Sequence, residues 1–71
     1  MRTEWVAVQS TCIRRVALEG KRAPYLLRLH LVGGTYLAYR LPTPAVYDKM
    51  LTAPSKGKYY NSVIKGKFPR A

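Results

Sequence analysis

Residues 25–41 of this chain read YLLRLHLVGGTYLAYRL, and the expected fold follows from them. From Tyr25 to Val32, apolar residues alternate with a mixed set, which is the two-residue period of a strand with one buried face. The apolar set that should face the core is Tyr25, Leu27, Leu29 and Leu31. Gly33-Gly34 suits a two-residue turn with positive φ, and Thr35–Leu41 is rich in β-forming residues. We therefore expect a β-hairpin.

Two further strands are expected before the hairpin. Trp5–Val8 is apolar and can begin a strand, Gln9–Thr11 is a polar bend, and Cys12–Leu18 is strand-like. Arg14 and Arg15 break the strict alternation of the last segment. We expect Cys12 to be a small core or strand residue.

Two short helices should follow the hairpin. Thr43 can cap a helix whose first residue is Pro44, and Ala53-Pro54 ends it. Ser55 can cap a second helix, and Gly66 suits the residue after its end. Apolar residues recur at helical spacing in both segments: Val46, Tyr47, Met50 and Leu51, then Tyr59, Tyr60, Val63 and Ile64. The prediction is one α+β domain over residues 1–71, with a core from about 8 to 68. A small antiparallel sheet of three to four strands would precede two short helices packed on one face.

The charge of the chain is strongly unbalanced. Thirteen Lys and Arg against three acidic residues give a net charge of +10 on 71 residues. Self-repulsion of this size destabilises a small domain, so it indicates an anionic partner: nucleic acid, an acidic protein surface or an anionic membrane face. We expect no membrane span, because no apolar run is long enough to cross a bilayer, and of the three candidates we do not favour a membrane as the partner. We expect a cytoplasmic location, because Cys12 is the only cysteine and small secreted domains usually carry several disulfides.

The sequence offers little for catalysis. His30 is the only histidine, and it lies on the mixed face of the predicted strand. The three acidic residues, Glu4, Glu19 and Asp48, belong to no recognisable motif. We therefore expect no enzyme, no cofactor, no metal site and no small-molecule substrate.

The first candidate for a binding surface is Ala53–Phe68, which reads APSKGKYYNSVIKGKF. Cations attract phosphate and aromatic faces stack on bases, and no acidic residue follows Asp48. The predicted binding residues are Lys56, Lys58, Tyr59, Tyr60, Lys65, Lys67 and Arg70. A second set, from the sheet, is Arg14, Arg15, Arg28, Tyr36 and Arg40. A helix beginning at Ser55 would also suit a phosphate or carboxylate, although the same residues serve equally well as a cap alone.

The chain resembles the KTSC domain, a small family found at the C-terminus of some lysyl-tRNA synthetases and as stand-alone proteins in bacteria and phages. The likeness runs from about Val8 to Phe68. Its most specific element is A-P-S-x-G-x-Y-[FY]-N-x-x-I, which Ala53–Ile64 reproduce. A G-x-Y-x-Y segment and a V-Y-x-x-L-type helix precede it. Here the former is Gly34–Ala38, with Ala38 in place of the second tyrosine, and the latter is Val46–Leu51.

The resemblance implies a role in the transcription or RNA apparatus. Attachment to a tRNA synthetase suggests RNA binding, and similar small phage proteins bind host RNA polymerase and alter initiation or termination. Our first hypothesis is a phage-type regulator that docks on RNA polymerase, with RNA favoured over DNA as the nucleic acid nearby. The alternatives are an autonomous module for single-stranded or tRNA-like RNA, and an adaptor for an acidic protein.

Overall fold

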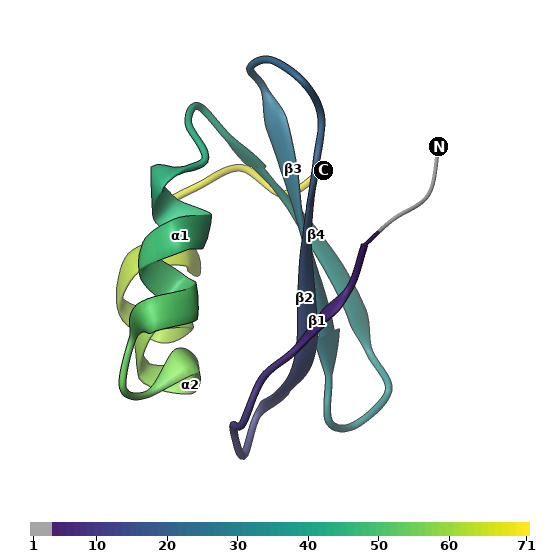
Figure 1. The fold of residues 1–71 in the computed structure, drawn as a ribbon, viewed down its shortest axis with the longest axis vertical. Coiled ribbons are helices and arrows are strands. Elements are labelled where there is room, and N and C mark those ends of the chain that lie inside the picture. Colours follow the sequence, from purple (N-terminus) through teal and green to yellow (C-terminus); the bar gives the residue numbers. More distant parts are fainter. Residues whose placement is uncertain (1–3) are drawn as a thin grey trace.

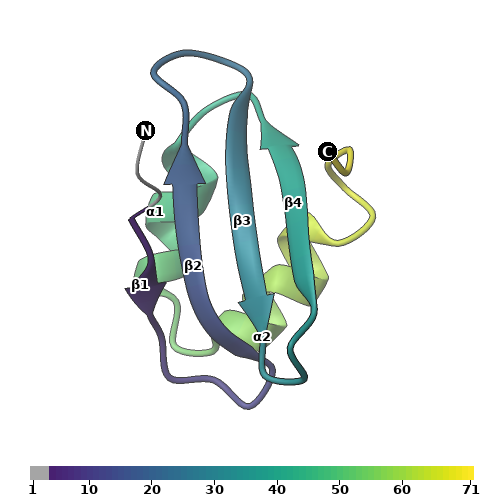
Figure 2. The same cartoon turned by 90° about the vertical axis from the view of Figure 1, so that its right-hand side faces the viewer.

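Four antiparallel strands and two helical segments make up the computed structural model, which describes residues 4–71. The strands are β1 (Val6–Ala7), β2 (Ile13–Glu19), β3 (Tyr25–Leu31) and β4 (Tyr36–Leu41), and they lie in the order β1-β2-β3-β4. The helices are α1 (Ala45–Thr52) and α2 (Lys56–Tyr59), and α2 continues into a π-helical turn, η1 (Tyr60–Ile64). Figure 1 shows the helices together on one side of the sheet, and Figure 2 shows its other face. The predicted α+β architecture is confirmed.

The core lies between the sheet and the helices. The sheet supplies Ile13, Val16, Leu27, Leu29, Tyr39 and Leu41, and the helical segments supply Met50, Tyr60 and Ile64. Leu27 and Leu29 are fully buried, which confirms the core face predicted for β3. Tyr59 and Val63 pack against the same cluster from its margin. The helical spacing of the apolar residues therefore marks the face that closes over the sheet.

The hairpin between β3 and β4 has a longer turn than predicted. The Leu31 N–H donates to the Thr35 carbonyl at 2.8 Å, and the Gly34 N–H donates to the Leu31 carbonyl at 2.9 Å. Three residues, Val32 to Gly34, therefore form the turn, and only Gly34 has positive φ, at 94°. A three-residue loop that ends in a left-handed glycine is the next most common hairpin connection after the two-residue turn.

Two local predictions were wrong in detail. Helix α1 begins at Ala45, with Pro44 as its cap residue, while the Thr43 hydroxyl still accepts from the Ala45 N–H at 3.3 Å. Cys12 is exposed and precedes β2, because Ile13 takes the first inward-facing position of that strand. The Ser10 hydroxyl accepts from the N–H groups of Cys12 and Ile13, at 3.1 and 3.2 Å, so this polar turn sets where β2 starts.

The C-terminal residues pair with the free edge of β4. The Arg40 N–H donates to the Pro69 carbonyl, and the Ala71 N–H donates to the Ala38 carbonyl, both at 2.9 Å. Tyr39 and Arg70 form an antiparallel bridge between these two bonds. The tail, which we expected to lie outside the core of the domain, therefore covers part of a sheet edge.

The open sheet face as candidate binding site

The face of the sheet that points away from the helices carries an unusual set of side chains. Cross-strand partners in an antiparallel sheet lie on the same face, so the pairing register defines this surface. Its three rows across β2, β3 and β4 are Arg15–His30–Tyr36, Ala17–Arg28–Ala38 and Glu19–Leu26–Arg40. We call this surface, together with Trp5 beside the first row, the open sheet face.

A β-bulge places Arg15 on the open sheet face. The register shifts between the Ile13–Leu31 and Arg15–His30 pairs, so Arg14 is the extra residue. Two residues then separate the buried Ile13 and Val16, where strict alternation would allow only one. The bulge explains the break in alternation that Arg14 and Arg15 cause in the sequence.

The first row forms a connected cluster of three rings and one guanidinium. The rings of His30 and Tyr36 stack at 4.2 Å with an interplanar angle of 3°. Trp5 meets both rings edge-on, at 6.4 Å from His30 and 6.1 Å from Tyr36. The Arg15 guanidinium lies over the Trp5 ring at 4.7 Å, an attractive cation–π geometry.

Two hydrogen bonds fix the position of Arg15 in this cluster. Its Nε donates to His30 Nδ1 at 3.0 Å, and its Nη2 donates to the Tyr36 hydroxyl at 3.3 Å. Because His30 accepts at Nδ1, the neutral imidazole carries its proton on Nε2. Desolvation, with the positive charges of Arg15 and Arg14 adding to it, lowers the pKa of His30 below its usual value. The lowered pKa favours the neutral ring, which is the form that can accept the Arg15 Nε–H bond.

The remaining rows carry two arginines and one acidic residue. Arg28 lies between two alanines, and its Nε donates to the Glu19 carboxylate at 2.6 Å. Arg40 is exposed at the far end of the surface. The open sheet face thus combines an aromatic cluster at one end with the Arg28–Glu19 ion pair and Arg40 on its other rows. Exposed rings and cations arranged on a sheet are the features by which several RNA-binding folds hold single strands.

Two comparisons place the chain among known proteins. The sequence pattern of the KTSC domain matches residues 9–68. The chain belongs to the KTSC domain family. It is also 43% identical over 47 residues to a protein of Tsukamurella paurometabola, an alignment that covers 65% of this chain and 69% of that protein. The family assignment confirms the resemblance drawn from Ala53–Ile64, and the match includes all of the open sheet face except Trp5.

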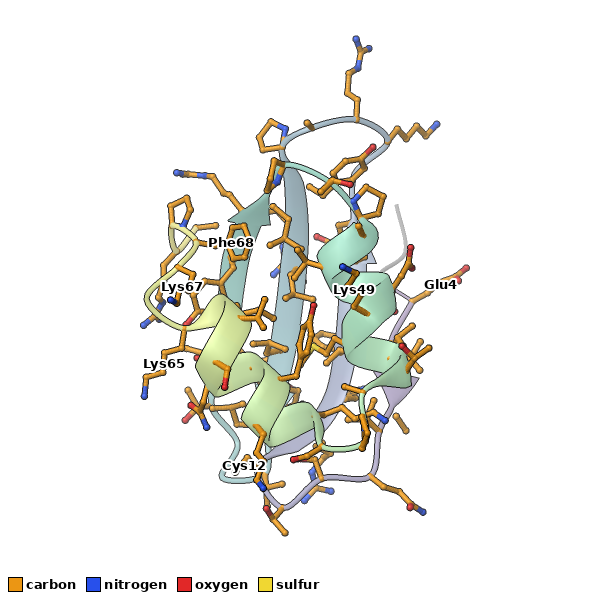
Figure 3. The ribbon with its side chains drawn as sticks, turned by 90° about the vertical axis from the view of Figure 1, so that its left-hand side faces the viewer. Glu4, Cys12, Lys49, Lys65, Lys67 and Phe68 are labelled. Atoms are coloured by element: carbon orange, nitrogen blue, oxygen red, sulfur yellow. The ribbon has the colours of Figure 1, made fainter. Side chains whose placement is uncertain are left out.

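In this KTSC domain, two of the binding residues predicted from Ala53–Phe68, Lys56 and Tyr60, are engaged within the fold. The Lys56 ammonium donates to the Ala53 carbonyl at 2.8 Å, so this lysine is turned back onto its own loop. The Ser55 hydroxyl accepts from the Lys58 N–H at 3.3 Å, which confirms Ser55 as a helix cap. Figure 3 shows Lys65 and Lys67 together beside Phe68, at one edge of the helix-covered side, whereas Lys49 projects from α1.

Of the two tyrosines predicted as binding residues, Tyr60 lies in the core and Tyr59 at its margin. The Tyr60 side chain is 8% exposed, and its hydroxyl shares a hydrogen bond of 2.7 Å with that of Tyr39. Tyr60 therefore belongs to the core and presents no ring face to a ligand. Burial and the bond to Tyr39 raise the pKa of Tyr60 to about 12, and the nearby charge of Arg70 lowers it in part.

A groove lies on the helix side of the KTSC domain. Its volume is about 390 Å³, and it is lined by Ala53, Pro54, Ser55, Lys58, Tyr59, Ser62 and Val63. Most of these residues fall within the A-P-S-x-G-x-Y motif of the family or one helical turn after it. The motif therefore builds both the start of α2 and the wall of this groove.

Sequence reasoning named part of the open sheet face and missed the rest. Arg15, Arg28, Tyr36 and Arg40 were predicted as a second set, and the register brings them onto one face. Trp5 and His30 were not predicted. The signal for His30 was its place on the mixed face of β3, opposite Tyr36 across the hairpin. Trp5 could not be found in this way, because β1 pairs with β2 over only two residues.

Residues 4–71 contain neither a cluster of metal-binding side chains nor a membrane-spanning helix. No three His, Cys, Asp or Glu side chains of this part of the chain lie close enough together to hold a metal ion. None of its helices combines the length and the apolar character needed to cross a membrane.

Proposed function

We propose that this KTSC domain is a small basic binding protein that acts on RNA and holds a single strand on its open sheet face. The observation that carries the proposal is the Tyr36 ring, which is 58% exposed and backed by the parallel ring of His30. A base that stacks on an exposed aromatic ring gains about 1–3 kcal/mol. A ring already held by its neighbours loses little conformational freedom when the base arrives.

The arginines supply the second part of the interaction. Arg15 uses two of its five N–H groups within the cluster, which leaves others for a phosphate oxygen. Arg28 and Arg40 continue the positive charge along the sheet. Arg28, with its side chain 42% exposed, lies between the aromatic cluster and Arg40 and can contact a strand that runs from one to the other. We propose that the protein works by binding and not as an enzyme, in the cytoplasm.

The test is a titration of fluorescein-labelled single-stranded RNA of about 12 nucleotides, within the ~4–16 nucleotides that a small single-strand-binding fold covers. Tyr36→Ala should weaken binding about 5- to 150-fold, the equivalent of one lost stacking interaction. Val32→Ala is the matched control, because Val32 is another exposed apolar residue of the same hairpin. Trp5, the only tryptophan, gives a second readout through its fluorescence. Equal affinities for wild type and Tyr36→Ala would contradict the proposal.

Docking on RNA polymerase is a second candidate function, as in the small phage regulators that the family resemblance suggests. The groove on the helix side supports this candidate, because it lies on the surface opposite the open sheet face and leaves both accessible at once. Purified bacterial RNA polymerase should then be captured by the immobilised protein, and Tyr36→Ala should be captured equally well. Failure of capture at low salt would leave RNA binding as the remaining function.

A further inference from the structure

The groove on the helix side has mostly apolar walls, and Lys58 is the one charged residue that lines it. Ala53, Pro54, Tyr59 and Val63 provide the apolar surface, and Tyr59 and Val63 are held in place because they also pack against the core. Its volume of about 390 Å³ is at the lower end of the range for ligand pockets. Such a groove fits one large apolar group.

The charge around the groove determines which kind of segment can bring an apolar group to it. Lys58 lines the groove itself. Lys49 on α1 is followed by no acidic residue but stands next to Asp48, and Glu4 lies beside α1. Lys65 and Lys67, by contrast, lie at the other edge of the same helix-covered side, with no acidic residue in their part of the chain. A segment that crosses this surface is attracted when it is acidic and repelled when it is basic.

A nucleobase suits the groove less well than an apolar side chain. The polar edges of a base need hydrogen-bond partners when they are buried, and an unpaired one is costly. The groove offers the hydroxyls of Ser55 and Ser62, and that of Ser55 already accepts from the Lys58 N–H. The Lys56 ammonium is likewise engaged by the Ala53 carbonyl. An apolar side chain makes no such demand.

We propose that this groove docks a phenylalanine or leucine side chain carried by an acidic segment of a partner protein. Charge complementarity brings the segment to the surface, and burial of the side chain against Tyr59 and Val63 holds it there. The proposal does not depend on RNA binding by the open sheet face, which lies on the opposite side of the sheet (Figure 1).

The probe is the synthetic peptide acetyl-DEDFDED-amide, with acetyl-DEDADED-amide as its charge-matched control. Both are titrated into isotope-labelled protein, and the backbone amides are followed by NMR. We expect the phenylalanine peptide to shift the amides of residues 53–63 and to bind about tenfold or more tightly than the alanine peptide.

A pair of variants then locates the contact. Ser62→Glu places a negative charge in the groove at an exposed position and should weaken binding of the phenylalanine peptide about tenfold or more. Asn61→Glu makes the same change of charge at the exposed neighbour that does not line the groove, and should bind like wild type. Circular dichroism confirms that both variants are folded.

Four results would overturn the proposal. The first is equal affinity for the two peptides, and the second is no binding at millimolar concentration. The third is an equal effect of the two variants. The fourth is that single-stranded RNA displaces the peptide and shifts the same amide signals of the groove. That result would assign the groove to nucleic acid.

Discussion

His30 couples the stability of the open sheet face to pH. Its pKa is lowered in the folded protein, by desolvation first and then by Arg15 and Arg14. Below the ordinary value of 6.5, the unfolded chain therefore binds a proton more readily than the folded one. The contribution of His30 is fully present above that pH and is lost as the pH falls through 6.5 towards the lowered pKa. Protonation at Nδ1 also removes the acceptor of the Arg15 Nε–H bond.

The measurement is urea unfolding of wild type and His30→Gln at about pH 7.5 and about pH 5.5, on either side of the ordinary histidine pKa. The wild type should lose more stability than the variant over this interval. The other titrating groups are common to both proteins, so the difference between them reports His30. Equal losses of stability in the wild type and the variant would show that the cluster does not discriminate between the neutral and the protonated ring of His30.

The buried tyrosine pair predicts the opposite behaviour at alkaline pH. Burial, together with the hydrogen bond to Tyr39, raises the pKa of Tyr60 from 10.0 to about 12. Between these values the folded protein retains a proton that the unfolded chain releases, so stability falls as the pH rises. The loss should be on the order of 2 kcal/mol over this range, because one pKa unit corresponds to about 1.4 kcal/mol.

Tyr60→Phe removes the titrating hydroxyl and supplies the comparison. It should be less stable than wild type at neutral pH by about 1–3 kcal/mol, since it leaves the Tyr39 hydroxyl without its buried partner. Its stability should then fall less steeply than that of wild type in alkaline solution. A variant that tracks the wild-type curve above pH 10 would refute the linkage.

At the scale of single residues, the sequence shows which side chains are candidates for binding more readily than it shows their contacts. Arg15 and Tyr36 are conspicuous as a cation and an aromatic residue in strand-like segments. That they share a hydrogen bond depends on the bulge at Arg14 and on the register across three strands. A register shift of one residue reverses the face of every side chain, so the cluster follows only from the paired sheet.

At the scale of the elements, the two glycines near α2 occupy different structural environments. Gly66 follows the helical segment with φ of 75°, a conformation that strains any residue with a Cβ. Gly57 has no such φ and is buried where α2 meets the turn before β2. A Cβ there would lie 3.6 Å from Cys12 Sγ and from Ser10 Oγ, which is ordinary van der Waals contact.

Alanine should therefore change stability in opposite directions at the two positions. Gly66→Ala should destabilise the protein by about 1 kcal/mol or more, because of the left-handed backbone. Gly57→Ala should stabilise it by about 0.4–1 kcal/mol, since alanine restricts the unfolded chain and favours the helix. Thermal and urea unfolding measure both changes. A loss of stability in Gly57→Ala would show that the packing against Ser10 and Cys12 does not admit a methyl group.

The elements themselves were largely predictable, and their ends were less so. The period-2 run in β3, the diglycine and the apolar stripes of the helices are local patterns, and they gave the correct order of elements. The pairing of β4 with residues 69–71 is not local, and no pattern in the tail indicates it. The three-residue turn at Gly34 was missed because a diglycine is compatible with both turn lengths.

At the scale of the whole molecule, the excess of positive charge is divided between two opposite surfaces. Arg28 and Arg40 lie on the open sheet face, whereas Lys65 and Lys67 lie at the edge of the helix-covered side. The net charge of +10 alone predicts an anionic partner but does not say which surface meets it. Variants that remove the same charge from each surface in turn show which of the two surfaces meets the partner.

The double variants Arg28→Gln with Arg40→Gln, and Lys65→Gln with Lys67→Gln, each lower the net charge from +10 by two, to +8. Their global electrostatic effects are therefore matched. If the open sheet face holds single-stranded RNA, the arginine variant should reduce the slope of log K against log salt by about 1.4, since each lost phosphate contact accounts for about 0.7. The lysine variant should keep a slope close to that of wild type.

Anisotropy titrations at several salt concentrations give the slopes, and thermal unfolding confirms that both variants fold. Loss of the Arg28 bond leaves Glu19 nearby, which adds repulsion towards phosphate, so Arg40→Gln alone provides a cleaner lower bound of about 0.7. Equal slopes for the two double variants would mean that RNA is attracted by total charge and held on no particular face. A reduced slope in the lysine variant alone would move RNA to the helix-covered side, where it would compete with the acidic segment proposed for the groove.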